Sequence, residues 1–171
     1  MHTYLSTIFK SLQAQQLPAL LNILAKTQQH AKDAGMADAD LLERRLIEDM
    51  HPLHWQVQTV LELSLRSLAR LTEQDLPSLE FEEISFDGIL AQSKDVIARI
   101  AEYDLSVVDA NTNKMFEIPI GPEAKLDLSG EDYVLKFYLP NLYFHLTTAY
   151  NLARAAGVPI GKLDFMGPVF P

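Results

Sequence analysis

The residues best suited to chemistry are three histidines on two predicted helices. His145 follows Asn141 by four residues, and His51 precedes His54 by three, so each pair shares one helix face. Imidazole nitrogens bind zinc and nickel, and three of them leave an open position for water or substrate. His51, His54 and His145 are therefore candidate ligands of a weakly bound divalent metal. Asn141, which shares a helix face with His145, would be a poor ligand for zinc or nickel. Alternatively, the protein has no cofactor, and His145 lies inside the protein with a hydrogen bond to a tyrosine hydroxyl or a water.

Aromatic side chains surround His145 on the same helix. Tyr138, Asn141 and His145 follow one face, and Tyr150 lies one turn further along. Core packing accounts for most of these aromatic residues. A partly apolar cleft with few polar groups is also the usual form of a small-molecule site. We therefore predict a pocket lined by Asn141, His145, Tyr138 and Tyr150.

Four helical segments must position these residues. They carry apolar side chains at three- and four-residue steps, and they span about 5–35, 38–71, 86–100 and 129–156. Gly35 and Gly157 are expected to stop the first and the last, and Ser85 and Ser129 to cap the third and the fourth. Residues 103–129 lose the helical period and predict a small β-hairpin turning at Gly121-Pro122. The predicted fold is all-α: one domain over 1–171, a four-helix bundle with a hairpin between helices 3 and 4 and an extended C-terminal tail.

Three prolines fall inside the helical pattern. Pro18 predicts a kink or break near residues 15–17, and Pro140 predicts a bend. Pro52 either kinks one long second helix or starts a new one.

Composition excludes several function classes. The chain has 171 residues, no cysteine, 14 Lys and Arg and 23 Asp and Glu, which gives a net charge of −9. An acidic surface disfavours nucleic acid and anionic membranes, and no apolar run is long enough to span a bilayer. Without a signal-peptide pattern at its start, the chain is expected to be cytoplasmic.

Three sequence runs carry a family resemblance. Residues 48–53 read EDMHPL, residues 139–150 read LPNLYFHLTTAY, and residues 157–167 read GVPIGKLDFMG. They resemble the signature of a bacterial family of unknown function within the DinB-like superfamily of four-helix bundles.

The resemblance implies a site at one end of the bundle. The superfamily commonly holds a divalent metal with one histidine from the second helix and two from the last, four residues apart. His145, Arg154 and Gly157 match this pattern, whereas Asn141 replaces one ligand. Members of known activity include thiol-dependent S-transferases and a maleylpyruvate isomerase.

These observations leave three hypotheses. The leading one is a bundle whose metal site has degraded or been remodelled, leaving a polar-aromatic pocket around His145 for a small molecule. The second is a metal- or thiol-dependent transferase or isomerase that uses His51 or His54 with His145, holding nickel or zinc if a metal is used. The third is a non-enzymatic protein acting as a homodimer, because superfamily bundles often pair. The sequence therefore leaves open whether the protein is an enzyme.

Overall fold

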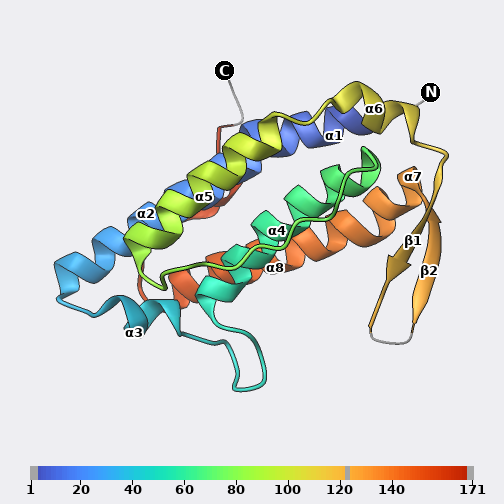
Figure 1. Cartoon of the computed structure of the whole chain (residues 1–171). Helices are drawn as coiled ribbons and strands as arrows, with labels where there is room; N and C mark the ends of the chain where they lie inside the picture. Colours follow the sequence, from blue (N-terminus) through green and yellow to red (C-terminus); the bar gives the residue numbers. More distant parts are fainter. Residues whose placement is uncertain (1–3, 122–123, 169–171) are drawn as a thin grey trace.

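The computed structural model describes residues 4–121 and 124–168, and it is mostly helical (Figure 1). Long helices run side by side, and one two-stranded sheet stands at an end of the molecule. The elements, in chain order, are α1 (Leu5–Ser11), the π-helix η1 (Leu12–Gln16), α2 (Leu17–Ala34), α3 (Asp38–Leu42), α4 (Leu53–Leu71), α5 (Phe86–Ala101), α6 (Leu105–Ala110), β1 (Met115–Pro119), β2 (Lys125–Ser129), α7 (Gly130–Asp132), the π-helix η2 (Tyr133–Tyr138), α8 (Leu139–Ala155) and α9 (Lys162–Met166).

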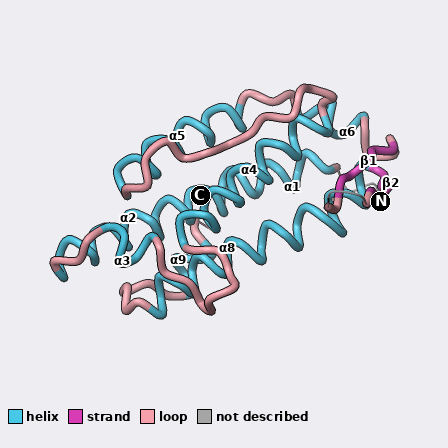
Figure 2. The backbone as a smooth tube through the Cα atoms, turned by 60° about the horizontal axis from the view of Figure 1, so that its bottom comes forward, coloured by secondary structure: helices cyan, strands magenta, loops and turns pink. Residues whose placement is uncertain are grey.

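The long helices pack around one main core. Helix α8 lies along α4 and also contacts α2, while α5 packs on α4 and α2 from the other side. In Figure 2, α5 and α8 accordingly lie on opposite sides of the bundle. The predicted helical fold with a small antiparallel sheet is confirmed in this coarser form. Because the described chain also contains the short helices α3, α6 and α9, the predicted count of four helices is not confirmed.

Two prolines are accommodated by π-helical turns. Pro18 and Pro140 each lie two residues after a π-helix, η1 or η2, and the backbone stays helical throughout. A proline ring inside an α-helix meets the carbonyl four residues earlier, and a wider π-turn moves that carbonyl away. The kink or break expected near residues 15–17 is therefore a π-helical turn at Leu12–Gln16, without a break in the helix.

The predicted second helix is two helices. The short helix α3 ends at Leu42, an exposed loop follows, and α4 begins at Leu53 with Pro52 in extended conformation before it. Of the two possibilities for Pro52, the structure has the start of a new helix. The loop places His51 at the N-terminal end of α4.

The segment between the third and fourth long helices holds more helix than expected. Strands β1 and β2 pair antiparallel, with Phe116 opposite Leu128, as predicted. The expected turn falls partly on residues 122–123, outside the described residues. Helix α6 was not predicted, because its six residues bury only Val108 and give no readable period. Asp104 caps it by accepting a hydrogen bond from the Ser106 amide.

The tail after Gly157 is not extended throughout. Gly157 has φ of +92°, as expected of a helix stop, but residues 162–166 then form α9. The Asp164 carboxylate accepts a hydrogen bond from the Gly161 amide and so caps this helix at its start. Across the described part of the chain, no helix combines the length and apolar character needed to cross a membrane.

Candidate functional site

A line of polar side-chain pairs joins α4 to the continuous helical stretch of η2 and α8. Polar pairs between packed helices favour one register of the two helices, because an unpaired buried polar group is costly. The pairs are Gln56–His145 at 2.7 Å, Ser64–Tyr138 at 3.2 Å and Ser67–Tyr133 at 2.8 Å. Only the first pair contains a group that titrates near neutral pH.

Gln56 determines which nitrogen of His145 carries the proton. The Gln56 amide nitrogen donates to the carbonyl of His51 at 2.9 Å, which fixes the orientation of the amide and turns its oxygen towards His145. An amide oxygen only accepts, so the Nδ1 of His145, 2.7 Å away, must donate. The lone pair of the neutral ring is then on Nε2. The structure gives Nε2 no hydrogen-bond partner among the described residues, and His145 is only half-buried.

The surroundings of His145 favour its neutral form. Burial lowers the pKa of His145 below its ordinary value of 6.5, and the nearby charge of His51 lowers that pKa further. Phe144 packs edge-on against the ring at 5.1 Å between centroids, and Trp55 does so at 5.5 Å. His145 is therefore a neutral base in an aromatic setting at pH 7.

His51 and Trp55 complete the outer side of this group. The exposed His51 ring stacks on the Trp55 indole at 3.7 Å between centroids. Because Trp55 also touches His145, one indole links the two imidazoles. We call Gln56, Trp55, His51, Phe144 and His145 the His145 site.

The residues present do not fit a three-histidine metal centre. His54 Nε2 faces Glu43 at 3.4 Å, and its Nδ1 is buried without a hydrogen-bond partner. Burial lowers the pKa of His54, although Glu43 opposes that shift. The Asn141 amide donates to the Phe137 carbonyl of its own helix at 2.7 Å. Among the residues that the structure describes, no three His, Cys, Asp or Glu side chains are grouped so that they could hold a metal ion.

The two predicted pocket tyrosines have different neighbours from His145. Tyr138 is 1% exposed, stacks on Phe9 and donates to Ser64. Burial raises the pKa of the Tyr138 phenol far above its ordinary value, so it stays neutral. Tyr150 packs on Phe165 and lines a hollow between α8 and α9 whose lining does not include His145.

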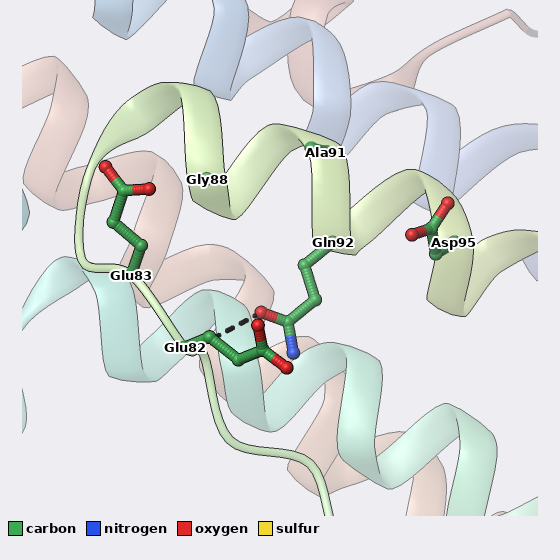
Figure 3. A pocket seen from close by; sticks show the side chains of 6 residues that line it. All are labelled: Glu82, Glu83, Gly88, Ala91, Gln92 and Asp95. Carbon is green, nitrogen blue, oxygen red and sulfur yellow. Dashed lines mark hydrogen bonds between the residues drawn. The ribbon is translucent and has the colours of Figure 1, made fainter.

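An acidic hollow beside α5 is a second place to consider for chemistry. It is lined by Glu82, Glu83 and Asp95, and also by Gly88, Ala91 and Gln92. Figure 3 shows that the three carboxylates point in different directions, while Gln92 is tied to the backbone amide of Glu82. They do not converge on a common point, so the hollow offers no cation-binding geometry.

The sequence left the main partner of His145 unidentified. A tyrosine hydroxyl or a water was expected, and the structure supplies Gln56 instead. One signal for this partner was present in the sequence. Gln56 lies among the apolar residues that α4 buries, and a buried amide without a hydrogen-bond partner would be costly. Trp55 was likewise not predicted to touch His145.

Comparison with known proteins places the chain in a family. None of the curated proteins matches the sequence. A crystal structure of a DinB family member protein from Shewanella denitrificans aligns with a TM-score of 0.85 at 26% identity, covering 100% of this chain and 99% of that one. The family described as a domain of unknown function (DUF1993) matches residues 5–166. The chain therefore belongs to the DUF1993 family and is DinB-like.

Proposed function

We propose that this protein is a DinB-like bundle whose metal site has been remodelled into a small-molecule binding site around His145. The observation that carries the proposal is the hydrogen bond from His145 Nδ1 to Gln56, which leaves Nε2 as the free nitrogen. In this arrangement the imidazole acts as a hydrogen-bond acceptor or as a base.

Two further contacts support remodelling. The amide of Asn141, at the position of a missing ligand, is engaged by its own helix. His54 is turned towards Glu43. The amide nitrogen of Asn141 and the Nε2 of His54 are thus each engaged by a protein partner.

The chemistry of the site indicates the kind of ligand. Nε2 accepts from an O–H, N–H or S–H group, and the Trp55 and Phe144 rings favour a flat or apolar body next to that group. The acidic net charge of −9 disfavours polyanionic ligands.

Metal analysis tests the remodelling directly. The full chain, purified without a tag, is expected to contain much less than one equivalent of nickel or zinc, and His145→Ala should not change that content. Stoichiometric nickel or zinc that is lost in His145→Ala would refute the proposal.

A thiol-dependent transferase or isomerase is the second candidate function. The free Nε2 of His145 favours it, because a neutral imidazole nitrogen can take the proton of a thiol, giving a thiolate and an imidazolium. A glutathione-type thiol should then perturb the NMR resonances of the His145 ring in the wild-type protein. The thiolate absorbance of this thiol should also be higher with the wild type than with His145→Gln. Identical thiol titration in the two proteins would exclude this candidate.

A further inference from the structure

The hollow between α8 and α9 brings together two parts of the chain outside the His145 site. It has a volume of about 200 Å³ and is lined mostly by apolar atoms, from Thr147, Tyr150, Asn151, Lys162 and Phe165. The first three residues lie on α8 and the last two on α9. Lys162 and Phe165 are three residues apart, so they share one face of α9. The hollow therefore combines two aromatic rings with a single charged side chain.

Helix α9 is fixed by residues that do not line this hollow. The Asp164 carboxylate accepts a hydrogen bond from Lys26 of α2 at 2.6 Å. Beyond α9, Gly167 has φ of +67°, and a Cβ atom at this position would lie 2.6 Å from the carbonyl oxygen of Gln15. The first contact ties α9 to α2, and the second brings the end of the tail against η1. The remaining face of α9 is thereby presented to α8.

The two aromatic rings form one wall of the hollow. Phe165 meets Tyr150 edge-on, with 5.6 Å between the ring centroids. Both side chains are half-buried, and both line the hollow. Edge-on and offset contacts are the arrangements that aromatic rings prefer, and small-molecule sites are commonly lined by such rings. This wall therefore suits the ring of a small ligand.

The charge around the hollow is positive, although the protein is acidic. Residues 133–163 contain no Asp or Glu and three Lys and Arg residues, one of them Lys162, whereas the whole chain has a net charge of −9. Asp164, the next acidic residue along the chain, is paired with Lys26. The exposed Lys162 ammonium makes no ion pair or hydrogen bond with another described residue. An anionic group that enters the hollow therefore meets an unpaired cation.

We propose that this hollow binds a small monocarboxylate that carries an aromatic ring. The ring packs against Tyr150 and Phe165, and the carboxylate accepts hydrogen bonds from the Lys162 ammonium. Thr147 and Asn151 add a hydroxyl and an amide at the same hollow, and neither side chain is engaged by another described residue. The volume is below the roughly 300–1,000 Å³ of sites for larger ligands, which favours a single ring with one acidic group.

Benzoate is the probe that tests this proposal. The full chain, labelled with ¹⁵N, is titrated with benzoate at constant ionic strength and followed by amide NMR. We expect saturable shifts at residues 147–151 and 161–166. Benzyl alcohol has the ring without the charge, and acetate has the charge without the ring. Each should bind about tenfold more weakly than benzoate, because each lacks one of the two interactions.

Lys162→Met tests the charged group. It removes the ammonium from an exposed position and keeps an apolar stem, so the fold should be unchanged and the dissociation constant of benzoate should rise about tenfold. Lys136→Met is the matched control, because Lys136 pairs with Asp132 and does not line the hollow. This variant removes the same charge and should bind benzoate as the wild type does. His145→Gln should also leave the affinity unchanged, which separates the hollow from the His145 site.

Three results would overturn the proposal. The first is the absence of saturable shifts with benzoate, and the second is a set of shifts confined to residues outside 147–151 and 161–166. The third is an equal affinity of folded Lys162→Met and Lys136→Met for benzoate, because the ammonium of Lys162 would then have no part in binding.

Discussion

Replacing Gln56 by leucine isolates the contact on which the His145 site depends. Gln56 is 1% exposed and makes two hydrogen bonds, to the Nδ1 of His145 and to the carbonyl of His51. A net contribution of about 0.5–1.5 kcal/mol for each bond predicts that Gln56→Leu lowers the free energy of unfolding by about 1–3 kcal/mol. The half-buried position of His145 keeps the loss within this range, because water can reach part of the ring.

A double-mutant cycle with His145→Ala separates this contact from general destabilisation. Urea unfolding of the wild type, both single variants and the double variant gives the coupling energy, which we expect to be about 1 kcal/mol. In thermal unfolding, Gln56→Leu alone should lower Tm by roughly 2–12 °C for a chain of this size.

Gln58 provides the matched control for this cycle. Its side chain bonds the backbone of Leu79 and Phe81 and does not bond His145. Gln58→Leu should therefore lower the free energy of unfolding, and its effect should add to the effect of His145→Ala without coupling. A Gln56–His145 coupling within about 0.3 kcal/mol of zero would refute the assigned hydrogen bond.

Two further predictions concern pH and the buried tyrosine. Because folding lowers the pKa of His145, the unfolded state takes up a proton before the folded state does as the pH falls through 6.5. The free energy of unfolding therefore decreases as the pH falls below 6.5. The free energy of unfolding of His145→Gln, followed by urea titration, should fall less steeply with acidification than that of the wild type, and equal slopes would contradict the lowered pKa. Ser64→Ala should cost about 1–3 kcal/mol because it leaves the buried Tyr138 hydroxyl without a partner. Tyr138→Phe should cost only about 0.5–1.5 kcal/mol, because Ser64 still donates to the Val60 carbonyl. Thermal unfolding of both variants in parallel compares them, and the reverse order would be inconsistent with these hydrogen bonds.

The features that the sequence predicts well are local ones. Gly35 ends its helix with φ of +65°, and Ser85 and Ser129 each accept a hydrogen bond from an amide three residues later. Each signal depends on a few neighbouring residues and on backbone geometry that glycine or serine favours.

The features that the sequence predicts poorly depend on distant contacts or on short segments. The π-helical turns before Pro18 and Pro140 keep the helical backbone continuous, whereas a kink or a break was expected near residues 15–17. The bond from His145 to Gln56 joins residues 89 positions apart, and helix periodicity cannot fix the register between two helices. Tyr138 and Tyr150 lie on the continuous helical stretch of η2 and α8 that also carries His145. Tyr138 nevertheless turns into the core, and Tyr150 packs on Phe165 of the tail.

The protonation of His145 is the property on which the proposed binding site rests. Long-range proton–nitrogen NMR of the full chain, with histidine labelled with ¹⁵N and His145 assigned from His145→Gln, identifies the protonated ring nitrogen at a pH well above 6.5. We expect a protonated Nδ1 and a bare, pyridine-like Nε2. Protonation on Nε2 instead would remove the free acceptor and contradict the proposed role of His145.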